Sequence, residues 1–265
     1  MTGSLPYSQV ALAWLGCSIA LAVFWWQQVR TSNANLVDVA WAAAIGTVAV
    51  AYAWMGSGPP LTRLVIALLP AMWAARLAAH IGRRALHAPE DSRYRYLRSY
   101  WTQHTQTRFF LFYQVQALTV LIFSFQFFVL ANLPTPRPVW AIGLTIVIWA
   151  VAVSGEGISD LQLSTWRDDP THYGNTCRSG LWRYSRHPNY FFEWLHWWSY
   201  VPLAIGTPWW WLPLLAQALM LFTLLRVTGI PHAERQALAR RGDDYRDYQA
   251  TTSAFFPWFP KKKPQ

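Results

Sequence analysis

Charged residues are scarce in this chain. Only 13% of its 265 residues are Asp, Glu, Lys or Arg, whereas roughly 25% is usual in a soluble domain. Hydrophobic residues make up 54% and are arranged in long runs, together with 18 tryptophans and 12 tyrosines. This composition excludes an ordinary soluble domain and predicts a membrane protein, in which amphipathic aromatic rings settle at the interfaces.

Several chemical motifs are also absent. The chain has no GxGxxG turn for a Rossmann nucleotide site, no GxSxG turn for a serine hydrolase and no HExxH sequence for a zinc protease. Its two cysteines, Cys17 and Cys177, are too few for a disulfide framework. Glu193 and His196 have the spacing of a di-iron bundle, but the second copy that such a bundle needs is missing. No basic stripe with stacking aromatics is present, so we expect no metal and no nucleic-acid partner.

The apolar runs predict an all-α integral membrane protein with about seven transmembrane helices. Each run is near the roughly 20 residues that cross a hydrocarbon core, and each must be helical because backbone groups in lipid need partners within the segment. No linker or repeat interrupts the chain, so we expect one membrane domain over 1–265, with an N-terminal part at 1–109 and a C-terminal part at 110–265. The expected spans are 9–28, 36–56, 61–82, 110–132, 138–160, 188–206 and 208–229.

The basic residues predict the orientation of these spans. Lys and Arg gather between the third and fourth spans, between the fifth and sixth, and after the seventh, whereas the loops on the other side contain only Arg63 and Arg137. Cytoplasmic loops carry an excess of Lys and Arg, so we expect the N-terminus outside and the C-terminus in the cytoplasm. Topology and attraction to anionic lipid explain the net charge of +10.

Polar residues recur on helical faces in the cytoplasmic half of the expected bundle. Charges at membrane depth are costly and usually mark a site. Asp38 could instead cap its helix, and Asp160 could lie at a solvated helix end, but Arg76 and Glu156 lie deeper. The faces comprise Asp38 and Trp41; Arg76, His80, Arg83 and His87; Glu156, Asp160 and Arg167; Asn189, Glu193, His196 and Tyr200; and Arg226 at the end of the seventh span.

This mixture of residue types suits a phosphate-rich cofactor. Arginine binds phosphate through paired hydrogen bonds, and carboxylates accept hydrogen bonds from ribose hydroxyls or an adenine amine. The apolar surroundings suit a lipophilic substrate. We also expect the proline of the run GLWRYSRHPNYFFEW, Pro188, to begin a helix directly after His187, because proline is favoured in the first turn.

That run, preceded by SDLQ, resembles a large family of bacterial membrane proteins related to the C-terminal domain of steroid 5-alpha-reductases. The RHPxYxxE element is shared more distantly with isoprenylcysteine carboxyl methyltransferases, sterol reductases and phospholipid methyltransferases. NLVDVAW, ARLAAHIGRR, PEDSRYRYLR and RGDDYRDYQATTSAFFP extend the resemblance over most of the chain. It implies a seven-helix reductase that binds NADPH from the cytoplasm and passes a hydride to a double bond conjugated to a carbonyl.

The resemblance also implies roles for individual residues. Asp38 falls near the acid that donates a hydrogen bond to the substrate carbonyl, and Trp73 stands where the steroid enzymes have a tyrosine. An indole can donate one hydrogen bond but cannot deliver a proton. Trp41, Arg76 and His80 would line the substrate cavity. The cofactor side would comprise Glu156, Asp160, Arg167, Tyr184, Arg186, Asn189, Glu193, Arg226 and Tyr248.

Three functions therefore remain open at this point. The first is an NADPH-dependent reductase acting on a lipophilic enone, in a monomer embedded in the lipid bilayer of a bacterial inner membrane with its cofactor site facing the cytoplasm. The second is an S-adenosylmethionine-dependent membrane methyltransferase, which needs fewer arginines because its cofactor has no phosphates. The third is a transporter or other non-enzymatic membrane protein.

Overall fold

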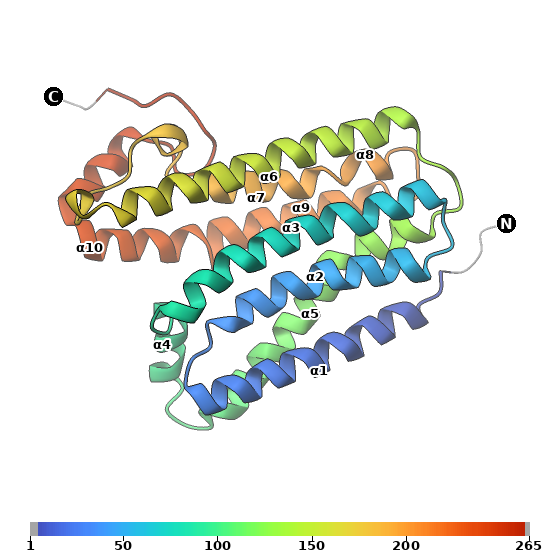
Figure 1. Cartoon of the computed structure of the whole chain (residues 1–265), viewed down its shortest axis with the longest axis horizontal. Coiled ribbons are helices and arrows are strands. Elements are labelled where there is room, and N and C mark those ends of the chain that lie inside the picture. The colour runs from blue at the N-terminus through green and yellow to red at the C-terminus, as the bar shows by residue number, and fades with distance from the viewer. Residues whose placement is uncertain (1–4, 263–265) are drawn as a thin grey trace. The chain divides into compact units, whose positions relative to one another are not determined.

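The computed structural model describes residues 5–262, apart from the side chain of His87, and within that range it contains helices and no strand (Figure 1). The chain forms two compact units, Met1–Ile142 and Gly143–Gln265. The boundary between them lies inside a helix.

The first unit contains four long helices and one short one. They are α1 (Ser8–Thr31), α2 (Leu36–Met55), α3 (Pro60–His87), α4 (Ser92–Tyr100) and α5 (Thr105–Asn132). α2 packs against α1, α3 and α5, and α1 also packs against α5. From the sequence we expected four spans in this part of the chain, and α1, α2, α3 and α5 agree with them.

Hydrogen bonds join the connections at each end of this unit. At one end, the amide nitrogen of Ala34 donates to Glu90, 2.9 Å away, so the α1–α2 connection contacts the segment after α3. At the other end, the amide nitrogen of Gly58 donates to the carbonyl oxygen of Ala131, also at 2.9 Å. The four long helices therefore run alternately up and down.

The second unit begins with most of α6 (Val139–Asp168). Two short 3-10 helices follow, η1 (Pro170–His172) and η2 (Gly180–Arg183), and then α7 (Pro188–Trp198), α8 (Val201–Ala204), α9 (Trp211–Phe222), the π-helical turn η3 (Thr223–Val227) and α10 (Ile230–Thr251). α7 begins at Pro188, as the sequence predicted. Gly229 separates η3 from α10, where the sequence expected the seventh span to be interrupted.

Six helical segments of the described chain are long and apolar enough to cross a membrane, so the protein is a multi-pass membrane protein by length and composition. The expected span at 188–206 is not one continuous helix, because α7 ends at Trp198 and α8 begins at Val201. The physical reason is Pro202 in the first turn of α8, since proline has no N–H and its ring clashes with the carbonyl four residues earlier.

The last of the six segments, Trp211–Thr251, has 41 residues and is too long for a bilayer about 30 Å thick. Its apolar part is α9 with η3. α10 carries charged residues along its length, among them Glu234, Arg240, Asp244 and Arg246, and therefore lies outside the hydrocarbon.

Candidate functional site

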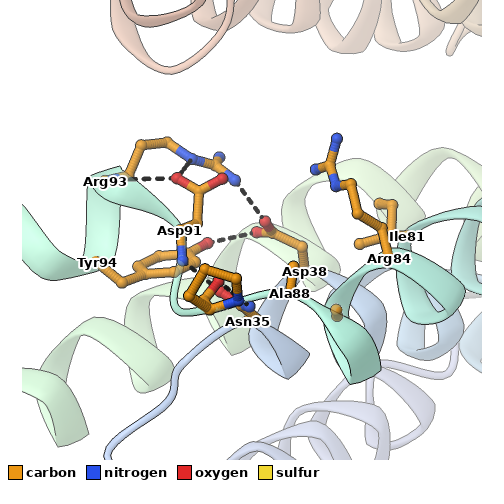
Figure 2. Close-up of a pocket in the computed structure, with 10 residues that line it drawn as sticks. Asn35, Asp38, Ile81, Arg84, Ala88, Asp91, Arg93 and Tyr94 are labelled. Carbon is orange, nitrogen blue, oxygen red and sulfur yellow. Dashed lines mark hydrogen bonds and ion pairs between the residues drawn. The ribbon is translucent and has the colours of Figure 1, made fainter. Parts of the chain in front are cut away.

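The carboxyl group of Asp38 is the centre of a polar cluster in the first unit (Figure 2). One of its oxygens accepts a hydrogen bond from the guanidinium of Arg93 at 2.8 Å, and the other accepts from the hydroxyl of Tyr94 at 2.7 Å. Asp38 lies in the first turn of α2, and its two partners lie in the first turn of α4. Both Asp38 oxygens therefore act as acceptors in this arrangement.

The loop before α4 is held in place by side chains on either side of it. The Asn35 side chain accepts from the amide nitrogen of Asp91 at 2.7 Å and donates to the carbonyl of Pro89 at 3.1 Å. Asp91 caps α4 by accepting from the amide nitrogen of Arg93 at 2.9 Å, and it also accepts from the Arg93 side chain at 3.1 Å. These bonds fix Arg93 against Asp38.

Charge and burial act together on the two partners of Asp38. Burial raises the pKa of the Tyr94 hydroxyl well above its ordinary value, and the negative charge of Asp38 raises it further. Burial alone would lower the pKa of the Arg93 guanidinium, but Asp38, Tyr94 and Asp91 outweigh it and raise that pKa. Tyr94 therefore stays protonated and Arg93 stays charged at neutral pH.

A cavity of about 50 Å³ lies beside this cluster, with Asn35, Asp38, Ile81, Arg84 and Tyr94 among its lining residues. Such a volume holds a few water molecules at most. It is too small for a nucleotide or a steroid.

The other residues expected on the substrate side do not line this cavity. The indole nitrogen of Trp41 donates to the hydroxyl of Thr119 on α5 at 2.8 Å, so Trp41 helps to join α2 to α5. Trp73 is fully buried on α3, while Arg76 and His80 on the same helix are partly exposed.

The second unit brings a carboxylate and an amide together. The side chain of Asn189 on α7 donates to Asp160 on α6 at 3.2 Å. Glu156 lies one turn earlier on α6, and both acids are buried, with 3% and 8% of their surface exposed. The sequence expected these residues on one cofactor-binding surface, and the structure places them on neighbouring helices of one unit.

Two arginines expected to bind the cofactor lie at helix ends of the same unit. Arg167 is exposed in the last turn of α6, and Arg226 is exposed in η3.

Glu193 is also buried, with 8% of its surface exposed, and it accepts from the indole nitrogen of Trp197 at 3.1 Å. One turn further along α7, His196 and the hydroxyl of Tyr200 lie 2.9 Å apart. Glu193 and His196 therefore lie on α7 beside aromatic side chains, whereas Tyr200, which was predicted on the same helix, lies after its end and directly before α8.

Arg186, also expected on the cofactor side, is enclosed by protein groups. Its Nε donates to Glu234 on α10 at 2.6 Å, and its Nη1 donates to the carbonyls of Thr252 at 2.6 Å and Gln249 at 3.1 Å. His187 Nε2 lies 3.4 Å from the same Glu234 oxygen. Arg186 thus joins the loop before α7 to α10, and no pattern in the sequence indicated Glu234 as its partner.

These neighbours strongly change the pKa of the Glu234 carboxyl group. Burial by itself would raise its pKa, but the hydrogen bonds from His187 and Arg186 and the charge of Arg186 outweigh burial and lower the pKa to about 2. The Arg186–Glu234 pair is therefore ionised throughout the physiological range.

The two tyrosines proposed for the cofactor side have different surroundings. The hydroxyl of Tyr248 on α10 is buried against the carbonyls of Trp182 and Ser185, which positions the loop before α7. Tyr184 is partly exposed in that loop, and its carbonyl accepts from the amide nitrogen of Trp258 at 2.9 Å.

Sequence reasoning missed Arg93, Tyr94 and Glu234 as partners of the residues it selected. The first two lie in the PEDSRYRYLR segment, whose acidic and basic residues follow one another at the start of a helix. That pattern could have indicated that Arg93 and Tyr94 take part in a polar cluster. Glu234 offers no comparable signal, because only the fold brings it to Arg186. In the described part of the chain, no three His, Cys, Asp or Glu side chains are arranged to hold a metal ion.

Comparison with protein families matches residues 24–252 to DUF1295, described as a protein of unknown function. Because this match covers most of the chain, the protein belongs to that family. No curated protein matches the chain.

Proposed function

We propose that this DUF1295 protein is a membrane-embedded reductase that uses NADPH to reduce a carbon–carbon double bond conjugated to a carbonyl in a lipophilic substrate. The observation that carries the proposal is the cluster in the second unit, where Asn189 donates to buried Asp160 beside buried Glu156. A carboxylate and an amide from different helices form a surface that can recognise several groups of one ligand.

The chemistry of this set fits a dinucleotide. Carboxylates accept from ribose hydroxyls or the adenine amine, the Asn189 amide can bind a carboxamide, and arginine binds phosphate. NADPH, when bound, supplies the hydride. Arg167 and Arg226 are exposed and suited to its phosphates, whereas Arg186 is already enclosed by Glu234 and backbone carbonyls.

On the substrate side we propose Asp38 and Trp73 as hydrogen-bonding groups. Trp41, Arg76 and His80 complete the proposed substrate side, although they do not line the cavity of about 50 Å³ beside Asp38. A donor aimed at the substrate carbonyl stabilises the negative charge that develops on its oxygen. Asp38 accepts bonds from Arg93 and Tyr94, so a donor role for Asp38 requires one of these bonds to open.

We further propose that α7 and α8 together form a broken span, which gives seven crossings. Support comes from the contacts of the second unit, where Arg186 binds Glu234 and Arg178 binds Asp244 at 2.7 Å. The loop before α7 and α10 therefore lie on the same side of the membrane, and the segment between them must return to that side. The distribution of Lys and Arg makes this side the cytoplasm, so the cofactor surface would face the cytoplasm of a bacterial inner membrane in a monomeric protein.

Cofactor binding to the detergent-purified protein tests the proposal. We would titrate NADPH, NADH and S-adenosylmethionine separately against the wild type, Arg167→Ala and the control Arg246→Ala. Arg246 is exposed and pairs with Asp243 outside the proposed surface. We expect saturable NADPH binding that Arg167→Ala weakens about tenfold or more, since a charge-assisted hydrogen bond contributes about 1.5–3 kcal/mol, and that Arg246→Ala leaves unchanged.

The other outcomes would overturn the proposal in different ways. Binding of S-adenosylmethionine alone would favour a membrane methyltransferase. That alternative needs fewer arginines, and the enclosure of Arg186 removes one arginine from those available for phosphate. No binding of any of the three would favour a transporter or another non-enzymatic function.

A further inference from the structure

A groove of about 600 Å³ opens on the second unit, and Tyr184 is the one lining residue that was also assigned to the cofactor side. Its volume falls within the range of small-molecule sites, roughly 300–1,000 Å³. α6, η2 and α7 form its walls. Its lining includes Val151, Gly155, Ile158, Arg183, Tyr184 and Phe192.

The groove lies on the face of α6 opposite its carboxylates. Residues 151, 155, 158 and 162 follow one another at helical spacing on one face, and Glu156 and Asp160 project from the other side of the helix. The exposed fractions agree with this placement on opposite faces, because Val151 and Ile158 are 53% and 49% exposed while Glu156 and Asp160 are buried. Since α6 is one of the membrane-spanning candidates, this face meets lipid.

The apolar part of the groove depends on a glycine. A methyl group at Gly155 would come within 2.4–2.6 Å of the Phe192 ring, so only glycine allows the ring to lie directly against α6. Val151, Ile158 and Phe192 line the groove together with the small residues Ser154 and Gly155 and form its apolar part.

The other end of the groove is cationic. Arg183 is exposed, and within residues 5–262 its side chain has no hydrogen bond or ion pair; its guanidinium carbon lies 6.0 Å from the centre of the Tyr184 ring. The turn that carries it is fixed, because the amide nitrogen of Leu181 donates to Gln162 on α6 at 2.9 Å. The positive charge of Arg183, which has no acidic partner among the described residues, therefore lies beside the apolar part of the groove.

The segment after α10 places this cationic end at the membrane surface. Trp258 bonds to the carbonyl of Tyr184, and the Phe259 ring packs edge-on against the Tyr184 ring with centroids 5.9 Å apart. Trp258 and Phe259 are 71% and 76% exposed. Large exposed aromatic residues of membrane proteins settle at the level of the lipid headgroups.

We propose that this groove binds one anionic phospholipid, with an acyl chain along Val151, Ile158 and Phe192 and the phosphate at Arg183. Charge complementarity selects an anionic headgroup, because the groove contains a cation and no carboxylate. The site uses the face of α6 opposite Glu156 and Asp160 and shares only Tyr184 with the residues proposed for the cofactor side.

Native mass spectrometry of the detergent-purified protein tests this, with phosphatidylglycerol and phosphatidylcholine of identical acyl chains added in separate titrations. Arg183→Gln removes the cation, and Arg95→Gln is its control, because Arg95 is exposed on α4 and does not line the groove. Ile158→Trp fills the apolar part, and Leu161→Trp is its control at a position on α6 that is 66% exposed and outside the lining. All four positions are exposed, so the variants should fold.

We expect one phosphatidylglycerol to bind more tightly than phosphatidylcholine. Arg183→Gln and Ile158→Trp should each weaken its binding about tenfold, and the two controls should not. Equal binding of the two lipids, or equal losses in variants and controls, would overturn the proposal and indicate only a general lipid shell. Displacement of the lipid by glycerol phosphate, which has no acyl chain, would also overturn it by showing that the apolar groove contributes nothing. None of these measurements requires NADPH, so their outcome is separate from that of the proposed reductase function.

Discussion

At the scale of single residues, the most consequential feature is that charged side chains are paired with groups far away in sequence. Asp38 bonds to Arg93 and Tyr94, and Arg186 bonds to Glu234. Each pair joins segments that the sequence alone could only treat separately. Two predictions concern these pairs directly.

The first prediction concerns the Tyr94 hydroxyl. Tyr94→Phe keeps the ring, which is 3% exposed, and removes the hydrogen bond to Asp38. We expect the free energy of unfolding to fall by about 1–2 kcal/mol, because the partly buried carboxylate of Asp38 loses one of its donors. Thermal unfolding in detergent measures this. Tyr96→Phe is the control, since that residue is 63% exposed and should change nothing; equal effects of the two substitutions would contradict the assignment.

The second prediction concerns pH and Glu234. Its pKa falls from the ordinary 4.5 to about 2 in the folded protein, so its pairing stabilises the fold fully above pH 4.5, and this stability is lost as pH falls toward 2. Glu234→Gln should therefore lower stability at neutral pH and reduce the loss seen on acidification. Unfolding temperatures measured between pH 7 and pH 3 provide the test.

Asp243→Asn is the control for this experiment, because Asp243 pairs with Arg246 at the surface and its side chain is 92% exposed. Exposed ion pairs contribute little to stability. If Asp243→Asn altered the change of stability with pH as much as Glu234→Gln, the ion pair between Arg186 and Glu234 would not be the cause of that change.

At the scale of elements, small residues set how closely helices approach. Gly46 on α2 is buried against α3, where an added methyl group would lie 2.6 Å from the Ala74 side chain and 3.3 Å from the Ala71 backbone. Helices in membranes associate through such close packing of small residues, because lipid offers no hydrophobic driving force between them.

The third prediction follows from this contact. Gly46→Ala should destabilise the protein by about 1–3 kcal/mol through overpacking, and Ala74→Gly in the same chain should recover part of the loss by removing the opposing methyl group. Unfolding in detergent measures both. Gly16→Ala on α1 is the control, since nothing lies within 4 Å of the added methyl group. Failure of Ala74→Gly to restore stability would place the strain at the Ala71 backbone instead.

At the scale of the whole molecule, the direction of each crossing decides on which side of the membrane the proposed cofactor surface lies. The fourth prediction uses single cysteines in a chain whose Cys17 and Cys177 have been replaced by alanine. Tyr173→Cys, at a position 94% exposed between α6 and α7, should react with a membrane-impermeant maleimide only after cells are permeabilised. Trp54→Cys, at a position 84% exposed near the end of α2, should react in intact cells.

The reverse pattern of labelling would contradict the proposed orientation and would place the proposed cofactor surface outside the cytoplasm. Labelling of both positions in intact cells would contradict the number of crossings between them. Phe259→Cys serves as a third site, because the contacts between α10 and the loop before α7 require it to react like Tyr173→Cys.

The sequence by itself determined the helical membrane class, because long apolar runs can satisfy their backbone groups in lipid only as helices. It also determined that α7 begins at Pro188 and that a break lies at Gly229, since proline and glycine act on the backbone locally. The break between α7 and α8 could have been read from Pro202 in the same way.

Only the tertiary structure decided which partners the polar residues have. Arg186 and Arg167 look alike in the sequence, yet one is enclosed by Glu234 and backbone carbonyls and the other is exposed. Helical spacing shows which face of its own helix a side chain occupies. It cannot show which distant segment covers that face, because the contact is determined by tertiary packing between segments that are far apart in the chain.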